Sequence, residues 1–115
     1  MFTVKWTPEA AGAYNALREK ASRSVKARTK KSQRKSSQAE GLFKQVHTTI
    51  DLLRNSPRPP GLNTHEYASI ANPFDDKKKV SEAYAQNNTP GAYRVFWCYG
   101  PGAKEITIIA ITAHP

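Results

Sequence analysis

The segment that determines the architecture is residues 93–113, YRVFWCYGPGAKEITIIAITA. Its first part, residues 93–99, is rich in aromatic and β-branched side chains, which favour strands. The Gly100-Pro101-Gly102 sequence that follows is typical of a turn. Residues 106–113 then form the most apolar strand-like run of the chain. The segment therefore predicts a β-hairpin, and we expect residue 99 to lie opposite residue 105.

The residues before this hairpin predict one strand and two helices. Residues 2–6 alternate apolar and polar side chains, which is the period of a half-buried strand. Thr7-Pro8-Glu9 is typical of a helix start with Thr7 as the N-cap. The apolar positions of this first helix are Ala10, Tyr14, Leu17, Ala21 and Val25. Those of a second helix are Ala39, Leu42, Val46, Ile50 and Leu53. Asn55-Ser56-Pro57 should end it, because proline disfavours helical geometry in the preceding residue.

A third predicted strand, residues 80–86, precedes the hairpin, while residues 62–79 allow either a short strand or a loop around 64–67. The order strand, helix, helix, strand, strand, strand predicts an α+β fold with a helical hairpin and a three-stranded antiparallel meander. The chain of 115 residues has the usual size of one domain, 1–115. No apolar run approaches the roughly 20 residues that span a bilayer. Cys98 is the only cysteine, and we expect a cytoplasmic protein without a signal peptide, an intrachain disulfide or a thiolate zinc site.

Positive charge is concentrated in one part of the chain. The net charge is +9, and residues 18–35 hold nine basic side chains against one acidic side chain, a local net charge of +8. Such a concentration attracts phosphate backbones through counterion release, without reading their sequence. We call residues 18–37 the basic arm and expect it to bind a polyanion, in particular RNA. The alternative is a solvated basic segment without a partner.

The order of elements and several segments resemble the RelE/ParE toxin superfamily over nearly the whole chain. These segments are Val4–Ala10, the second helix running into Ser56-Pro57, Val80–Tyr84, Gly91–Val95 and the closing Thr112-Ala113-His114-Pro115. In that superfamily, toxins enter the ribosomal A site and cut mRNA without a metal, by attack of a ribose 2′-hydroxyl on the adjacent phosphate. The resemblance implies the ribosome, mRNA and a cognate antitoxin as partners, and no cofactor.

Three residues are the catalytic candidates that the resemblance and their chemistry suggest. Arg94 lies in a predicted central strand, where its charge needs a carboxylate or a ligand, and its planar fork suits a phosphate. Glu82 is then either a general base or the ion-pair partner that balances Arg94. His114 has the side chain best suited to proton transfer near neutral pH, unless it is only a frayed terminal residue. A pairing of residue 99 with residue 105 would place Arg94 and His114 on one face of the sheet, and a one-residue change in the loop would place them on opposite faces.

The candidate RNA-binding residues are mostly basic. They are Lys26, Arg28, Lys30, Lys31, Arg34 and Lys35 in the basic arm, Lys77, Lys78 and Lys79 before the third strand, and Tyr84 within it. The three consecutive lysines are equally consistent with a solvated turn. Tyr84 would stack on a base or donate a hydrogen bond. His65 and Tyr67 are two polar aromatic residues that could stack on a splayed base, although no spacing rule supports that role. The three histidines lack a metal-binding spacing.

Two other functions stay open on the same fold. One is a ParE-like inhibitor of DNA gyrase, and the other is a non-catalytic module that binds RNA or the ribosome. In many relatives this strand carries charged residues into the site, and some of them are lysines. This chain has Glu82 and Tyr84 there instead, and the loss of the lysines favours the binding module. His114 favours the nuclease, because an inhibitor of gyrase needs no acid or base.

Overall fold

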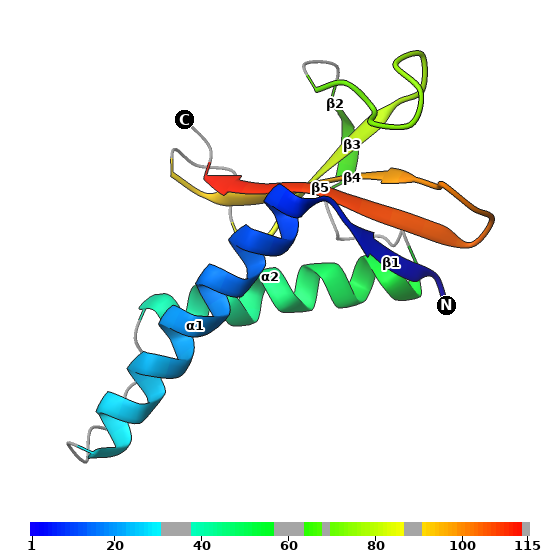
Figure 1. The fold of residues 1–115 in the computed structure, drawn as a ribbon. Coiled ribbons are helices and arrows are strands. Elements are labelled where there is room, and N and C mark those ends of the chain that lie inside the picture. The colour runs from blue at the N-terminus through cyan, green and yellow to red at the C-terminus, as the bar shows by residue number, and fades with distance from the viewer. Residues whose placement is uncertain (31–37, 57–63, 68–69, 87–90, 114–115) are drawn as a thin grey trace.

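The computed structural model describes residues 1–30, 38–56, 64–67, 70–86 and 91–113. Two helices and five strands follow one another along the chain (Figure 1). They are β1 (Thr3–Trp6), α1 (Pro8–Lys30), α2 (Gln38–Asn55), β2 (Thr64–Tyr67), β3 (Val80–Tyr84), β4 (Tyr93–Tyr99) and β5 (Glu105–Ala113). None of the helices in these described ranges is long and apolar enough to cross a membrane.

The strands form one mixed sheet in the order β1-β5-β4-β3-β2. β1 pairs with β5 in parallel, and the other three pairs are antiparallel. The predicted α+β class and the meander of β3, β4 and β5 are therefore confirmed. The structure adds β2 at one edge of the sheet, where the sequence left a strand or a loop open. β3 is two residues shorter than predicted, because the amides of Ala85 and Gln86 both donate to the carbonyl of Tyr93.

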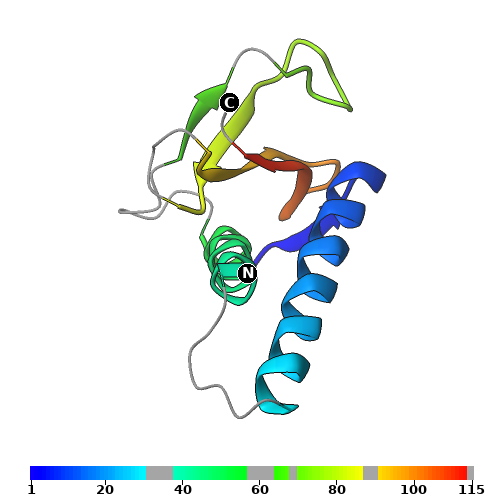
Figure 2. The same ribbon diagram turned by 90° about the vertical axis from the view of Figure 1, so that its left-hand side faces the viewer.

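Both helices pack on the same side of the sheet, and the second half of α1 projects beyond it (Figures 1 and 2). The predicted apolar stripe of α1 accounts for this arrangement. Ala10 and Ala21 are buried, whereas Val25 is 41% exposed, so the stripe ends where the helix leaves the domain. The backbone of α1 nevertheless continues to Lys30. The basic arm thus begins on a helix that extends away from the core.

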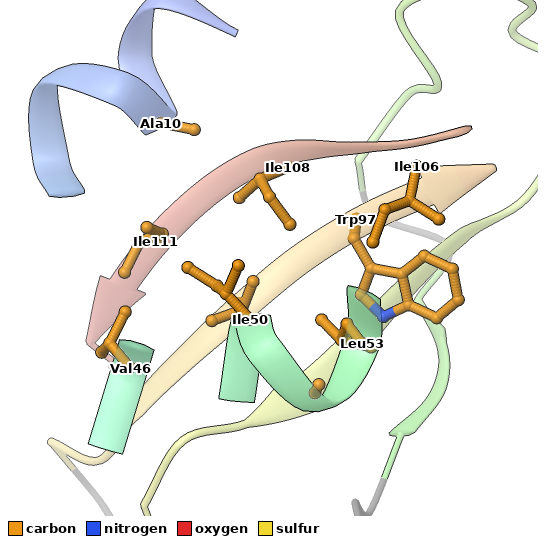
Figure 3. Close-up of a cluster of buried hydrophobic side chains, with 10 residues drawn as sticks. Ala10, Val46, Ile50, Leu53, Trp97, Ile106, Ile108 and Ile111 are labelled. Atoms are coloured by element: carbon orange, nitrogen blue, oxygen red, sulfur yellow. The ribbon is translucent and has the colours of Figure 1, made fainter. Parts of the chain in front are cut away.

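The hydrophobic core lies between α2 and the central strands β4 and β5 (Figure 3). It contains the predicted stripe residues Val46, Ile50 and Leu53 of α2. Facing them are Val95 and Trp97 of β4 together with Ile106, Ile108 and Ile111 of β5. Because side chains alternate along a strand, the burial of Val95 and Trp97 against α2 turns Arg94 and Phe96 to the other face of the sheet. We call that other face the outer face.

The predicted register of the β4–β5 hairpin is wrong by one residue. Tyr99 lies opposite Ile106 rather than Glu105, and a β-bulge follows, since Trp97 pairs with Ile108 and Phe96 with Ala110. The bulge leaves Ile109 as the extra residue of β5. Its carbonyl accepts a hydrogen bond from Thr7 Oγ1 at 2.7 Å, and the carbonyl of Ile108 accepts one from the Thr7 amide at 3.1 Å.

Thr7 therefore joins the start of α1 to the bulge in β5. Its hydroxyl oxygen also accepts a hydrogen bond from the amide of Ala10 at 3.1 Å, which is the predicted N-cap interaction. The bulge adds a second one-residue shift to the one at the turn, so that Arg94 lies directly opposite Thr112. Even-numbered residues of β4 and of the end of β5 consequently share the outer face, as the sequence predicted from a different register.

Candidate active site

The candidate site lies where β3 and β4 pair on the outer face of the sheet. Tyr84 lies opposite Arg94, and Glu82 lies opposite Phe96. These cross-strand neighbours share a face, because side chains opposite one another in an antiparallel pair point the same way. The register thus brings together three residues that the sequence analysis selected separately: Glu82, Tyr84 and Arg94.

Arg94 and Glu82 form an ion pair with a distance of 2.6 Å between Nη1 and Oε2. Their side chains are only 10% and 2% exposed, so the pair is nearly closed to water. A charge at such a position is tolerated only when it is paired or hydrogen-bonded. The structure therefore has the ion pair that the sequence analysis proposed as the alternative to a free phosphate clamp.

Two aromatic rings enclose the guanidinium of Arg94. Its Cζ atom lies 4.8 Å from the ring centroid of Phe96 and 5.4 Å from that of Tyr67, distances typical of cation–π contacts. The two rings also pack on each other, with centroids 4.8 Å apart. Within the described part of the chain, the buried Nε of Arg94 has no hydrogen-bond partner. The guanidinium is thus fixed in direction and keeps an unused donor.

Tyr84 completes this cluster at the end of β3. Partial burial, a hydrogen bond to the Glu82 carboxylate and the negative charge of Glu82 raise the pKa of the Tyr84 phenol, against the opposing charge of Arg94. The phenol therefore stays protonated at neutral pH and acts as a donor. The role of Tyr84 toward RNA, as a stacking surface or a hydrogen-bond donor, stays a prediction.

His114 lies outside the described residues, as does the rest of the terminus after Ala113. The pairing of β4 with β5 ends at Tyr93 opposite Ala113. The placement of His114 beside Arg94 therefore stays a prediction.

Lys77, Lys78 and Lys79 lie in the turn before β3, at the opposite end of that strand from Tyr84. Buried Asn72 organises the turn: its Oδ1 accepts hydrogen bonds from the amides of Phe74 and Asp75, and its Nδ2 donates to the carbonyl of Lys79. Lys79 pairs with Glu66 at 2.9 Å, and both side chains are well exposed. The lysines thus lie on a defined turn, separate from the Arg94–Glu82 pair.

The basic arm can be followed only in part. Arg18, Lys20, Arg23 and Lys26 are exposed on α1. Arg28 and Lys30 belong to its last turn, and Lys31, Arg34 and Lys35 lie outside the described residues. Ser24 Oγ donates to Glu40 Oε2 at 2.9 Å and links the arm to α2. The exposed part is compatible with binding to a polyanion, which stays a prediction.

Phe96 was not singled out from the sequence, and Tyr67 was considered only as a stacking surface for a base, although both rings contact Arg94. Alternation along β4 places Phe96 on the Arg94 face, and that signal was available. Tyr67 could not be placed, because the sequence left a short strand or a loop open around residues 64–67. Cys98 is buried, and burial raises the pKa of its thiol, as expected for a packing residue. Among the described residues, no three His, Cys, Asp or Glu side chains gather where they could hold a metal.

Comparison with known proteins identifies the fold. No protein-family model matches the chain, and no curated protein matches it by sequence. Among solved structures, the chain is similar to a YoeB/ParE toxin from Agrobacterium tumefaciens with a TM-score of 0.60. The match covers 98% of this chain and 99% of the toxin, at 7% sequence identity. The predicted RelE/ParE-type fold is therefore confirmed.

Proposed function

We propose that this protein is the toxin of a type II toxin–antitoxin pair and that it cuts mRNA on the ribosome. The observation that carries the proposal is the cluster of Arg94, Glu82 and Tyr84, which the β3–β4 register assembles on the outer face of a toxin fold. A cation for the phosphate and a protonated donor are two of the groups that the reaction needs. A separate antitoxin protein, which covers the basic surface, is part of this proposal.

In the proposed reaction, the ribose 2′-oxygen attacks the adjacent phosphorus and the bond from phosphorus to the 5′-oxygen breaks. The products are a 2′,3′-cyclic phosphate and a 5′-hydroxyl, and the chemistry requires no metal. Arg94, oriented by its ion pair with Glu82, supplies the positive charge that stabilises the phosphate. Tyr84 supplies the proton to the 5′-oxygen, and His114 accepts the proton of the 2′-hydroxyl. Glu82, closed in the ion pair, positions Arg94, and His114 is then the candidate base.

A non-catalytic module that binds RNA or the ribosome is the second candidate. The burial of the Arg94–Glu82 pair favours it, because a phosphate oxygen must reach a guanidinium whose side chain is 10% exposed. Both candidates share the polyanion-binding surface and differ only in the chemical step. An experiment on the products of RNA cleavage therefore separates them.

The test is inducible expression in bacteria with mapping of transcript ends, followed by purified protein on programmed ribosomes. We expect growth arrest, new 5′ ends within coding sequences and 2′,3′-cyclic phosphate on the upstream fragments. His114→Gln cannot transfer a proton near pH 7, and Arg94→Lys lacks the planar fork, so both should cut slowly while ribosome binding persists. The typical contribution of one acid or base is about 10²–10⁴-fold in rate.

Matched controls are His47→Gln and Arg54→Lys, which change the same residue types on α2, away from the outer face. Both should cut like the unmodified protein. Arrest with intact mRNA, or full activity of His114→Gln, would refute the nuclease. Loss of DNA supercoiling activity in treated gyrase would then support the gyrase inhibitor, and ribosome binding alone would support the binding module.

A further inference from the structure

A cavity of about 660 Å³ lies beside the candidate active site, at the edge of the sheet. Its walls come from β2, the start of β3 and the segment between them. The lining residues are Glu66, Tyr67, Ile70, Ala71, Asp76, Lys78, Lys79 and Val80. Its volume is within the range of cavities that bind small molecules and single nucleotides.

Tyr67 connects this cavity to the candidate active site. Its ring lines the cavity and also contacts both Phe96 and the guanidinium of Arg94. A ligand against Tyr67 would therefore be next to the residue that is proposed to hold the reacting phosphate.

The chemistry of the walls matches one nucleotide of a single strand. Tyr67 and Ile70, which are both partly exposed, offer an aromatic and aliphatic surface on which an unstacked base can lie, with buried Val80 behind them. Lys78 and Lys79 offer ammonium groups to the phosphate. Among the described residues, the Lys78 ammonium has no ion-pair partner, while Lys79 has an exposed one, Glu66, that is weakly held. The carboxylate of Asp76 can accept a hydrogen bond from a base amino group.

The turn that carries the lysines is held in place before any ligand binds. Asp75 Oδ1 accepts a hydrogen bond from the amide of Lys77 at 3.0 Å, and the Asp75 carbonyl accepts one from the amide of Lys78 at 2.9 Å. With the Asn72 hydrogen bonds described above, these contacts reduce the ordering that binding would require.

We propose that this cavity is a nucleotide subsite, which holds one unstacked base of single-stranded RNA against Tyr67 and its phosphate against Lys78. The subsite rests on the proposed function, in which RNA is the substrate. It deepens that function by assigning a place to the nucleotide next to the scissile phosphate. Binding there would fix the position of the strand relative to Arg94, and the cavity walls would influence which base is accepted.

The test uses a short 2′-O-methylated RNA oligonucleotide, which cannot be cut, and the full chain. Ala71 is exposed and lines the cavity, so Ala71→Leu should fill it without disturbing Arg94, and Ala71→Ser is the matched control. Lys78→Gln is matched by Lys77→Gln, because Lys77 is its neighbour but does not line this cavity.

We expect Ala71→Leu to bind the oligonucleotide roughly 5- to 150-fold more weakly, which is the usual loss for one stacked base. Ala71→Ser should bind it as tightly as the unmodified protein does. Lys78→Gln should weaken binding more than Lys77→Gln. Amide NMR shifts on binding should include Ala71 and Lys78.

Cleavage on ribosomes by the same variants separates this proposal from the proposed function. If the unmodified protein cuts mRNA while Ala71→Leu binds and cuts equally well, the subsite is refuted and the nuclease stands. If the unmodified protein cuts nothing but its RNA binding depends on Ala71 and Lys78, the subsite stands and the nuclease falls. Equal RNA binding by all four variants would overturn the subsite, and so would NMR shifts confined to residues outside the cavity. The subsite would also be overturned if the unmodified protein bound a partner protein at this cavity but did not bind RNA.

Discussion

The guanidinium of Arg94 and the carboxylate of Glu82 meet between two central strands, where water hardly reaches them. Bringing two charges into such a place is unfavourable, and their mutual attraction offsets that loss only while both partners are present. Removal of one partner leaves the other charge buried without a counterion. The pair therefore makes the candidate site both a chemical and a structural feature of the sheet.

We predict that Glu82→Gln lowers the free energy of unfolding by about 3–5 kcal/mol, the range for breaking one side of a buried ion pair. Glu82→Gln combined with Arg94→Gln should lose less, because no charge stays unpaired. Urea unfolding of the variants measures both values. Glu66→Gln, which breaks the exposed pair with Lys79, is the control and should change stability by at most about 1 kcal/mol. Equal losses for Glu82→Gln and Glu66→Gln would show that the pair is not closed to water.

Tyr84 leads to a prediction at high pH. Burial, together with the hydrogen bond and charge of Glu82, raises the pKa of its phenol. A group whose pKa is raised by folding keeps its proton longer in the native state, so stability is lost as the pH rises above the ordinary tyrosine value of about 10. We expect Tyr84→Phe to remove part of that loss in urea unfolding measured from neutral to alkaline pH. Tyr99→Phe, on an exposed ring, is the control. Identical pH profiles for Tyr84→Phe and the unmodified protein would contradict the assignment.

At the scale of single residues, the sequence predicted the ion pair of the candidate site better than the aromatic rings that surround it. An arginine in a central strand requires a counterion, and Glu82 was the nearest carboxylate on the preceding strand, so the ion pair could be inferred. The ring of Tyr67 could not, because its contact with Arg94 depends on a strand pairing that no local pattern specifies. His114 stays a candidate from the sequence resemblance and its chemistry.

At the scale of elements, α2 holds the helical layer on the sheet through Leu53, which is fully buried against β4 and β5 (Figure 3). We predict that Leu53→Ala and Ile108→Ala each lower the free energy of unfolding by about 2–5 kcal/mol, since truncation leaves a cavity in the core. Leu52→Ala is a matched control, because Leu52 is 45% exposed and its loss should be within about 0.5 kcal/mol. Losses below about 1 kcal/mol for the two buried residues would mean that the helix does not pack as described. Urea unfolding measures all three.

The elements themselves were largely predictable, because periodicity is a local property. The stripe of α2 and the alternation of β1 and β4 correspond to observed elements, and Asn55 ends α2 as expected. Two features were not predictable. β2 has only four residues and depends on pairing with β3, and the bulge at Ile109 depends on hydrogen bonds to Thr7, a hundred residues earlier in the chain. Such non-local contacts determine register, and register determines which side chains share a face.

At the scale of the whole molecule, charge and shape point in the same direction. The +9 charge is concentrated in residues 18–35, and the helix that carries the first of these residues extends past the sheet (Figure 1). A projecting cationic helix can contact phosphates at some distance from the Arg94 cluster. Affinity for RNA and position on RNA would then come from different parts of the molecule, the first from the basic arm and the second from the outer face.

This separation predicts how RNA binding responds to salt. Replacement of Lys30, Lys31, Arg34 and Lys35 with glutamine should flatten the log–log dependence of the binding constant on salt. Each phosphate contact with single-stranded RNA contributes about 0.7 to the slope, so the loss of four contacts would reduce it by up to about 3. Fluorescence anisotropy with an RNA oligonucleotide over a salt series measures the slope. The variant should unfold at the same urea concentration as the unmodified protein, since none of the four residues belongs to the apolar stripes predicted from the sequence.

Net charge alone could also weaken binding, so the control removes the same four charges elsewhere. Lys5, Lys44, Arg54 and Lys104 are exposed on the body of the domain, outside the basic arm. Their replacement with glutamine lowers the long-range attraction equally but breaks no contact of the arm. If the arm holds the phosphates, the slope should fall in the first variant and stay nearly constant in the second. Equal slopes in both variants would show that the arm adds only net charge and that the RNA contacts lie on the outer face, beside Arg94 and the lysines of the turn before β3.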